Sequence, residues 1–560
     1  MKDEIEIRIK KILQKLTGSK DIVLERPKQE FGDYAFPCFS LAKKNPALIA
    51  KKLAEKIKKK LPELKEISKV ESVGGYVNFF VNKEILFEKI IAKILAEKEK
   101  YGSLRLKGKA LIEHTSLNPN SSPHVGRIRN AIIGDIIARL LRFHGYDAEV
   151  HYYVNDVSKQ MALLVFGSKG DESFDELLDL YVKMSKELER NPELEKKVFE
   201  ILRKIEEGDK IVRTKLKRLV EIAINGQKEI LARLGINYDY FDYESVYLEK
   251  GILQKILKQL EKTGRLKKDF ENRYVLDQSN MKWQFEKEMK SPVFVLTRSD
   301  GTSLYSLRDI AYTIDKLKIA PVNIIVLGED HKLYYKQLSA ALELLGYTPP
   351  RVIHYSFILL KTAKGAKKMS TRKGDVVLVS NFIKEAIKKA EEEIRKRKRE
   401  GKVDLKKVAE AIAIGAIRYS IAKVEENKEI IFDWQEALNF DGNSAPYLQY
   451  VYARASSILK KAVKEGEPSY KNIDEKEFVL AKTLGMFPEI ARETLEQLKP
   501  HLLCNYAYQL AKTFNDFYEN CSVIRAEKGI KERRIDLVKA TKQVLANVLD
   551  LIGVPAIEAM

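Results

Sequence analysis

The sequence predicts a multidomain α/β protein, with a parallel-sheet core, a helical insertion, a small α/β domain before the core and an all-α bundle after it. Three observations predict this organisation. Strand-like and helical patterns alternate over residues 110–154, as in a βαβ unit. Residues 171–289 are charged and largely of helical period, and the chain after residue 431 is helical without strand-like segments. A chain of 560 residues also exceeds what one hydrophobic core usually supports.

The first elements are a strand over Ala110–Ile112, a loop of Ser, Asn and Pro, and a long helix that begins near Pro123. Proline is tolerated there because the first N–H groups of a helix have no intrahelical partner. Gly145 stands where the helix would end, and Ala148–Val154 is the second strand. The loop therefore meets a helix N-terminus, where free N–H groups and the helix dipole attract phosphate, as in a Rossmann-type parallel-sheet core.

A short motif, His124-Val125-Gly126-Arg127, opens this helix. Gly126 would let a nucleotide approach the backbone, and His124 could donate a hydrogen bond to a phosphate oxygen. Taken alone, the motif is more often a helix start with a buried histidine.

A second motif, KKMSTRKG over residues 367–374, lies between strand-like runs at His354–Leu360 and Val376–Val379. Its cations would neutralise a pyrophosphate leaving group as negative charge develops on it. A solvated basic hairpin is the alternative interpretation. The two motifs resemble the HIGH and KMSKS motifs of class I aminoacyl-tRNA synthetases, and their order in the chain argues against coincidence.

The resemblance implies ATP as a substrate, bound with Mg²⁺, and no metal site made by the protein itself. Catalysis would rest on positioning and charge stabilisation, without a protein nucleophile. The implied catalytic residues are His124, Arg127, Lys368 and Lys373. The implied ATP-binding residues are His124, Gly126, Arg127, Lys368, Met369 and Ser370.

Three positions depart from the family pattern. Arg127 replaces the last histidine of HIGH, so it can bind phosphate but cannot transfer a proton. Thr371 replaces the second lysine of KMSKS, although Lys373 could reach the same oxygens. Ser121 stands where many members have a lysine, so the charge is relocated to the lysine-rich loop.

The residues between the motifs resemble those of arginyl-tRNA synthetases. The order Glu113, Ser116, Asn118 and then His124 carries this resemblance, and in that family these positions hold the α-amino and guanidinium groups of the substrate. Tyr305 and Asp309 lie one helical turn apart, so both are expected to face one pocket, although a surface helix pair is the alternative for Asp309. Carboxylates suit a guanidinium because a planar bidentate pair rejects the point charge of lysine, and Glu113 with Asp309 would neutralise the substrate. His331 stands at a position where many family members have a glutamine that helps to hold the substrate. The implied arginine-binding residues are Glu113, Ser116, Asn118, Tyr305, Asp309 and His331.

Both ends of the chain resemble the tRNA-binding ends of the same family. Residues 31–35 and 74–79 resemble its N-terminal domain, and residues 440–450 resemble the start of its helical anticodon-binding domain. Aromatic rings and guanidinium planes are suited to stacking on unpaired bases, although a tyrosine of this kind is as often part of a bundle core. The implied tRNA contacts are Tyr76 and Asn78 for the D-loop, and Tyr450, Arg454, Tyr518 and Met560 for the anticodon.

Composition agrees with this interpretation. A net charge of +21 implies a polyanionic partner and salt-sensitive binding, or else a basic solubilising surface. Cys38, Cys504 and Cys521 form no CxxC pattern and suit a reducing cytoplasm. No apolar run approaches membrane-spanning length, and the first residues do not begin a signal peptide, so neither a membrane nor secretion is expected. By family resemblance the protein is expected to be a monomer.

The predicted activity is that of the arginyl family: ATP-dependent activation of L-arginine to arginyl-adenylate, then transfer to the 3′-terminal ribose of tRNA(Arg), on the 2′-hydroxyl by class I analogy. One alternative is a class I synthetase for another amino acid, against which the pair Glu113 and Asp309 argues. The other is a catalytically impaired tRNA-binding paralogue, suggested by Arg127 and Thr371. The predicted domains are an N-terminal D-loop-binding domain (1–101), the first half of the catalytic core (102–166), a helical insertion (167–289), the second half of the core (290–385), a helical stem-contact region (386–430) and the anticodon-binding helical domain (431–560).

Overall fold

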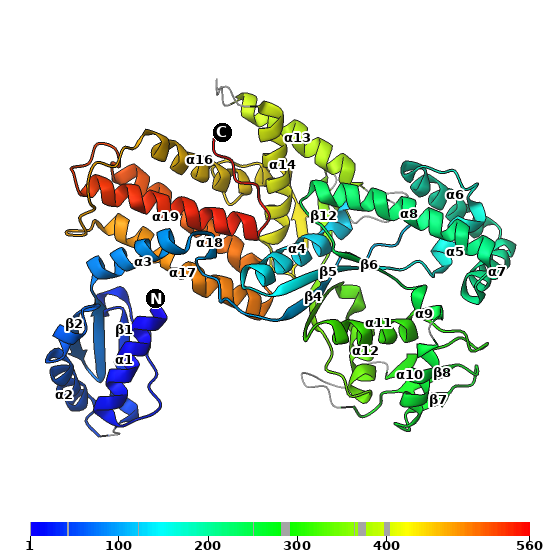
Figure 1. Ribbon diagram of the computed structural model, residues 1–560, viewed down its shortest axis with the longest axis horizontal. Coiled ribbons are helices and arrows are strands. Elements are labelled where there is room, and N and C mark those ends of the chain that lie inside the picture. The colour runs from blue at the N-terminus through cyan, green and yellow to red at the C-terminus, as the bar shows by residue number, and fades with distance from the viewer. Residues whose placement is uncertain are drawn as a thin grey trace.

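The computed structural model describes residues 2–41, 44–120, 122–249, 251–281, 292–362, 365–367, 377–396 and 404–560. The chain forms a mixed α/β molecule, in which a parallel sheet lies at the centre and a helical bundle packs on one side of it (Figure 1). The fold class predicted from the sequence is therefore confirmed. Within the described residues, no helix is both long enough and apolar enough to cross a membrane.

The N-terminal domain is a small sheet covered by helices. Its strands are antiparallel in the order β1-β3-β2, so β3 is central. The elements are α1 (Lys2–Thr17), β1 (Tyr34–Pro37), α2 (Pro46–Lys58), β2 (Ile67–Val73) and β3 (Tyr76–Val81). The next helix, α3 (Lys83–Glu97), leaves this domain and packs against the C-terminal helices α17 and α19.

The central sheet has five parallel strands in the order β11-β10-β4-β5-β6. In chain order this is the doubly wound arrangement, with its switch point between β4 and β10 and a ligand crevice expected outside the carboxyl ends of the strands. The strands are β4 (Lys109–Glu113), β5 (Asp147–Val154), β6 (Tyr240–Tyr243), β10 (Val322–Gly328) and β11 (Arg351–Tyr355). The buried helix α4 (Ile128–Phe143) connects β4 to β5, which confirms the predicted βαβ unit.

An arm of four helices extends from the end of β5 (Figure 1). These are α5 (Lys159–Gly167), α6 (Phe174–Arg190), α7 (Glu193–Glu207) and α8 (Lys210–Arg233). The stretch 167–289 was expected to be largely helical, but its described part also contains strands. β6 returns to the central sheet, and β7 (Leu266–Lys268) and β8 (Tyr274–Asp277) belong to a second small sheet. As a four-residue edge strand with partly exposed side chains, β6 gives no clear period-2 pattern.

A second small sheet and four helices cover the other part of the core. The antiparallel strands are β7 (Leu266–Lys268), β8 (Tyr274–Asp277) and β9 (Val293–Val295), and the helices are α9 (Val246–Glu249), α10 (Ile252–Glu261), α11 (Tyr305–Ile319) and α12 (Lys332–Leu344).

Two strand predictions near the basic motif differ from the structure. The run predicted as one strand over His354–Leu360 is divided, because β11 ends at Tyr355 and β12 (Ile358–Thr362) joins another sheet with β13 (Gly365–Lys367) and β14 (Ile430–Phe432). The strand predicted up to Val379 is wrong at that residue, where α13 (Val379–Lys396) begins. Buried apolar residues recur along α13 at helical spacing, which explains the helix.

The C-terminal region is helical apart from β14, which pairs with β12 and interrupts the stretch expected to be helical from residue 431 on. It comprises α14 (Leu405–Ala422), α15 (Trp434–Ala437), α16 (Ala445–Lys461), α17 (Glu475–Gln497), α18 (His501–Asn520) and α19 (Ile530–Leu551). Two buried arginines attach it to the core. Arg418 of α14 donates to Asp135 of α4 at 2.5 Å. Arg129 of α4 donates to backbone carbonyls of Ser356, Val424, Glu425 and Lys428.

Candidate active site

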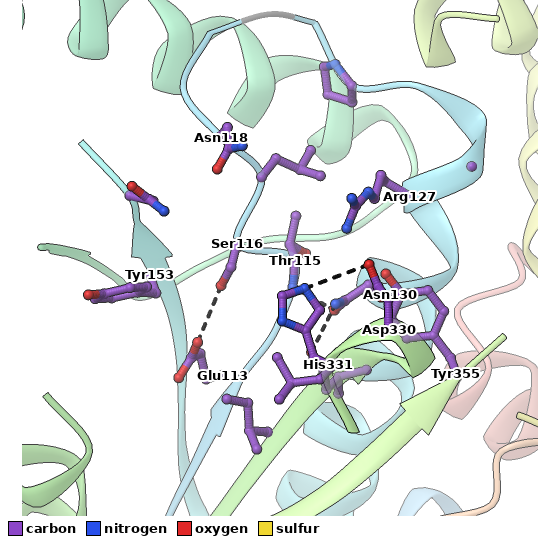
Figure 2. A pocket seen from close by; sticks show the side chains of 18 of the residues that line it. Glu113, Thr115, Ser116, Asn118, Arg127, Asn130, Tyr153, Asp330, His331 and Tyr355 are labelled. Carbon is purple, nitrogen blue, oxygen red and sulfur yellow. Dashed lines mark hydrogen bonds and ion pairs between the residues drawn. The ribbon is translucent and has the colours of Figure 1, made fainter. Parts of the chain in front are cut away.

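A cavity of about 700 Å³ opens at the carboxyl edge of the central sheet (Figure 2). Its walls come from the segment after β4, the start of α4, the ends of β5, β6 and β10, and the first turns of α11 and α12. This is the crevice expected at the switch point of a doubly wound sheet. The sequence-predicted residues that line it are Glu113, Ser116, Asn118, His124, Gly126, Arg127, Tyr305, Asp309 and His331.

The HVGR motif forms the start of α4. Residues Val125–Arg127 make a single 3₁₀ turn, and His124 precedes it with extended backbone. The backbone N–H of Val125 donates to the carbonyl of Val377 at 2.9 Å, so the chain that follows the basic motif lies against this turn. Burial, and secondarily Arg127, lowers the pKa of His124 to about 4. His124 is therefore a neutral hydrogen-bonding group at physiological pH, and the fixed cation beside it is Arg127.

The loop after β4 is held in an unusual backbone conformation. Thr115 and Ser116 have φ of 76° and 44°, in the left-handed region that non-glycine residues rarely adopt. The side chain of Asn130 holds this loop, since it accepts from the Thr115 N–H at 2.6 Å and donates to the Val326 carbonyl at 2.9 Å. As a result, the Ser116 hydroxyl turns back to donate to Glu113 Oε1 at 3.3 Å (Figure 2).

Further along the loop, two asparagines converge on one residue of α5. Asn118 and Asn120 each donate through Nδ2 to Oε1 of Gln160, at 2.8 and 2.9 Å. Asn118 is exposed at the mouth of the cavity, whereas Asn120 is buried. The interaction fixes Asn118 at the wall where the sequence predicted it.

Helix α11 presents a carboxylate to the cavity. Tyr305 and Asp309 both line it, as their one-turn spacing predicted. The Tyr334 hydroxyl donates to Asp309 Oδ2 at 2.6 Å, and the Thr313 hydroxyl donates to Oδ1 at 3.3 Å. Burial raises the pKa of Asp309 to about 6; Lys316 opposes this shift and Glu113 adds to it. Asp309 is thus mostly ionised near pH 7, in surroundings that favour a cationic ligand.

Glu113 already has a cationic partner. Its Oε2 contacts the ammonium of Lys316, and the side chains are 5% and 1% exposed. The expectation that Glu113 and Asp309 together neutralise a substrate cation therefore has to be revised. Of these two carboxylates, only Glu113 makes an ion pair within the described residues, whereas Asp309 accepts hydrogen bonds from the neutral hydroxyls of Tyr334 and Thr313.

His331 lies at the end of a 3₁₀ turn, Glu329–His331, that follows β10. Its side chain is 45% exposed, and its Nε2 is 3.9 Å from Asp330 Oδ2. It lines the cavity from the outer side, at the edge of the sheet next to Asp330 (Figure 2).

Several lining residues were not predicted. Tyr153 lies near the end of β5, Asn155 directly follows that strand, and Glu244 follows β6. The rule that ligands bind outside the carboxyl ends of parallel strands could have found these three. Tyr334 lies on α12 and reaches Asp309 only through the tertiary fold, so no pattern in the sequence indicates it.

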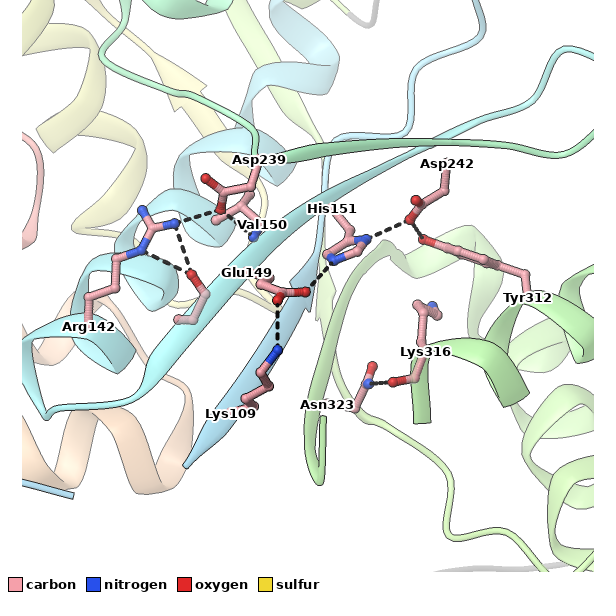
Figure 3. Close-up of polar contacts among 11 residues, drawn as sticks. Lys109, Arg142, Glu149, Val150, His151, Asp239, Asp242, Tyr312, Lys316 and Asn323 are labelled. Carbon is pink, nitrogen blue, oxygen red and sulfur yellow. Dashed lines mark hydrogen bonds and ion pairs between the residues drawn. The ribbon is translucent and has the colours of Figure 1, made fainter. Parts of the chain in front are cut away.

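A hydrogen-bonded network supports the cavity from behind (Figure 3). Tyr312 stacks on Tyr153 with ring centroids 4.4 Å apart, and its hydroxyl donates to Asp242 Oδ2 at 2.8 Å. Nδ1 of His151 lies 2.7 Å from the same oxygen, and its Nε2 lies 3.3 Å from Glu149 Oε2. The stacked tyrosines are therefore fixed in place by a chain of polar contacts between β5, β6 and α11.

Part of the basic motif lies outside the described residues. Lys368, Met369, Ser370 and Lys373, together with Thr371, lie outside the described residues, as does Ser121. The motif is bounded by β13, which ends at Lys367, and by Val377, whose carbonyl contacts the turn after His124.

The residues predicted for the D-loop lie on β3. Tyr76 is half-buried, and its ring meets that of the exposed Phe39 edge-on at 5.3 Å. Asn78 is only 2% exposed, because β3 is the central strand and both of its faces are covered. Contrary to expectation, Asn78 cannot contact a base in this conformation.

The residues predicted for the anticodon cluster on α16 and α18. The guanidinium of Arg454 lies 4.6 Å from the ring centroids of both Tyr450 and Tyr518. It also donates to Asn515 Oδ1 at 2.6 Å and to the Tyr450 hydroxyl at 2.7 Å. Tyr518 is 42% exposed, so this layered cluster reaches the surface. Met560, at the C-terminus, packs partly buried against the main hydrophobic core.

Comparisons with known proteins agree with this geometry. The domain described as "tRNA synthetases class I (R), catalytic domain" matches residues 90–434. The arginyl-tRNA synthetase N-terminal domain matches residues 2–81, and the DALR anticodon-binding domain matches residues 448–560. The arginine–tRNA ligase of Methanocaldococcus jannaschii is 39% identical, with 99% of each chain covered. That of Archaeoglobus fulgidus is also 39% identical, with 94% of each chain covered.

Solved structures show the same relationship. Thermus thermophilus arginyl-tRNA synthetase superposes with a TM-score of 0.81 at 30% identity, over all of both chains. The Plasmodium falciparum arginyl-tRNA synthetase shares the fold, with a TM-score of 0.78 at 22% identity over 99% of this chain and 98% of that one. These comparisons give no support to a synthetase for another amino acid or to an impaired paralogue. The chain belongs to the arginyl-tRNA synthetase family.

Proposed function

We propose that the cavity at the carboxyl edge of the central sheet is the site where this enzyme activates L-arginine. The overall reaction is that of the family: arginine and ATP give arginyl-adenylate, and the arginyl group is then transferred to the 3′-terminal ribose of tRNA(Arg). The observation that carries the assignment is the placement of Asp309 in the same cavity as the N-terminus of α4. One wall suits a guanidinium, and the other suits phosphate.

In the first step, an oxygen of the arginine carboxylate attacks the α-phosphorus of ATP, and the bond to the pyrophosphate oxygen breaks. In the second, a ribose hydroxyl of the tRNA, the 2′-hydroxyl by class I analogy, attacks the activated carbonyl and AMP leaves. Neither step needs a protein nucleophile, so the protein contributes position and charge. We assign phosphate binding to His124 as a neutral donor and to Arg127 as a cation, with Gly126 allowing close approach of the nucleotide.

The basic motif supplies the remaining positive charge in this proposal. Lys368 and Lys373 neutralise the leaving pyrophosphate, and Met369 and Ser370 contact ATP. Val377, which follows the basic motif in the chain, lies against the turn after His124. This contact supports a position of the basic motif beside the phosphates.

For the amino acid, we assign the guanidinium to Asp309, with Tyr305 beside it. Ser116 and Asn118 hold the α-amino end, Glu113 contributes an acceptor held in place by Lys316, and His331 covers the outer side.

Magnesium is proposed to enter with ATP. Within the described residues, no three His, Cys, Asp or Glu side chains gather as a metal site. Mg²⁺ keeps several waters and binds mainly through phosphate oxygens, so a dedicated protein cage is not required. When bound, it would neutralise charge on the triphosphate.

For tRNA, we assign the D-loop to the surface around Tyr76 and the anticodon to Tyr450, Arg454, Tyr518 and Met560. The net charge of +21 supports binding to a polyanion. The domain limits predicted from the sequence remain a proposal, with β6 now counted in the core. We also propose a monomer that works in the cytoplasm, which the three free, buried cysteines suit.

Substitutions in the basic motif test the proposed catalytic roles. Lys368→Ala and Lys373→Ala should each lower the single-turnover rate of adenylate formation more than they weaken arginine binding, because pyrophosphate charge develops only toward the transition state. Lys367→Ala is the matched control and should have little effect. Equal and small effects at all three positions would leave the motif as a solvated basic hairpin.

A further inference from the structure

We propose that Lys316 is a specificity-determining residue of the arginine pocket, because its ammonium pairs with Glu113 and leaves the substrate one carboxylate that makes no ion pair in the described part of the chain, that of Asp309. The inference rests on the proposed assignment of this cavity to arginine.

Lys316 lies on the same face of α11 as Asp309, two helical turns further on. Its ammonium contacts Glu113 Oε2 and lies 4.3 Å from the ring centroid of Tyr312 (Figure 3 shows Lys316 beside that ring). Tyr312 stacks in turn on Tyr153, which lines the cavity. The ammonium is thus held between a carboxylate and an aromatic face, directly behind the pocket.

Stability alone does not account for a lysine at this position. Its side chain is 1% exposed, and that of Glu113 is 5% exposed. Removing two such charges from water is costly, and apolar residues of similar volume often give equal or greater stability. The buried ion pair on the wall of a substrate pocket is therefore better explained by its effect on the charge that the pocket presents to the substrate.

The ion pair sets the charge beside Asp309. Glu113, Asp309 and Lys316 together carry one net negative charge when ionised, which one guanidinium neutralises. Two other acids nearby have their own partners: the buried Glu244 accepts from Arg308 Nε at 2.6 Å, and the partly exposed Asp242 faces His151 at 2.7 Å.

This arrangement favours a guanidinium over an ammonium. A compact ammonium is a strongly hydrated point charge, and two converging carboxylates would replace its water well. A planar guanidinium can be satisfied by a single carboxylate through two parallel hydrogen bonds. By occupying Glu113, Lys316 leaves lysine or ornithine with Asp309 alone and adds a like charge nearby. Such a repulsive element discriminates between related ligands.

A charge-balance experiment in the full-length enzyme tests the inference. Glu113→Gln, Lys316→Met and the double variant are compared by ATP–pyrophosphate exchange with saturating tRNA, using arginine, lysine and ornithine. Glu113→Gln leaves a buried ammonium unpaired beside the substrate cation, so the KM for arginine should rise about 100-fold. Adding Lys316→Met to Glu113→Gln should lower the KM for arginine again by at least about tenfold. Lys316→Met alone should raise kcat/KM for lysine relative to arginine by at least about tenfold.

The controls separate specificity from folding. Lys316→Arg keeps the charge and should keep the discrimination against lysine, and Lys316→Gln replaces Lys316→Met if the latter does not fold. A folded double variant no better than Glu113→Gln, or unchanged discrimination in the neutral variants, would overturn the inference. Asp309→Asn shows whether the assignment of the pocket fails or only the role of Lys316. If Asp309→Asn leaves arginine kinetics unchanged, the assignment of the pocket to arginine fails. If Asp309→Asn loses activity but the double variant does not rescue Glu113→Gln, only the role of Lys316 is refuted.

Discussion

The most informative single substitution is Asp309→Asn, because it keeps the shape of the pocket and removes one charge. In the structure, both oxygens of Asp309 accept hydrogen bonds, from Tyr334 and Thr313. The asparagine amide keeps one acceptor oxygen and turns the other atom into a donor, so one of the two hydroxyls must rotate to accept instead, while the side chains stay in place. The variant would face a desolvated guanidinium with a neutral amide. Underpairing a buried charge costs about 2–4 kcal/mol, which corresponds to a loss on the order of a hundredfold in kcat/KM for arginine.

The assay is arginine-dependent ATP–pyrophosphate exchange at saturating ATP and tRNA, near pH 7.5, where Asp309 is ionised. Tyr334→Phe is the matched control, since it removes one neutral donor and keeps the charge; it should cost less than about tenfold. If Asp309→Asn leaves kcat/KM for arginine within a factor of about two, the guanidinium is bound elsewhere and the reasoning is refuted.

Three further predictions follow from the same contacts. Because burial raises the pKa of Asp309 to about 6, its carboxylate becomes neutral below that pH, so kcat/KM for arginine should fall about tenfold per pH unit there. This fall of kcat/KM at acid pH should vanish in Asp309→Asn and persist in Glu244→Gln. Glu244 is the group to exclude, because burial raises its pKa to about 7. If the fall vanishes in Glu244→Gln instead, Glu244 is the titrating group. Tyr450→Ala should raise the KM for tRNA by about one to two orders of magnitude, because it removes a ring that stacks on Arg454, whereas Tyr450→Phe should have a small effect; an early-melting Tyr450→Ala with unchanged KM would make it a packing residue. Arg129→Met should lower the free energy of unfolding by about 3 kcal/mol, since one buried and three part-buried carbonyls lose their donor, and an unchanged urea midpoint would contradict this.

The sequence predicted the parts of the fold that have strong local patterns. The strand at Ala110–Ile112, the helix after Pro123 and the strand at Ala148–Val154 were correct because apolar periodicity and a proline mark them. The edge strand β6 was missed because its four residues are only partly buried. Val379 was assigned to a strand because Val and Leu precede it, whereas packing of the following helix decides its conformation.

The sequence predicts those site residues that local spacing places on one face, and it does not predict those that only tertiary contacts bring together. Tyr305 and Asp309 share a helix face, so their common pocket follows from sequence. Lys316 stands in a stretch with several charged residues and looks like a solvated helix position. Only the fold shows that it is buried against Glu113, more than two hundred residues earlier in the chain.

ATP–pyrophosphate exchange with different amino acids shows whether this cavity activates arginine. The family resemblance predicts exchange with arginine only when tRNA is bound, and the tRNA contacts proposed for both ends of this chain would allow such coupling. Citrulline, which has the shape of arginine without its charge, and lysine, which has the charge without the planar group, are the two informative controls. We expect exchange with arginine in the presence of tRNA, little without tRNA, and little with either control. Silence with arginine together with strong exchange with another amino acid, such as glutamate or cysteine, would contradict the account.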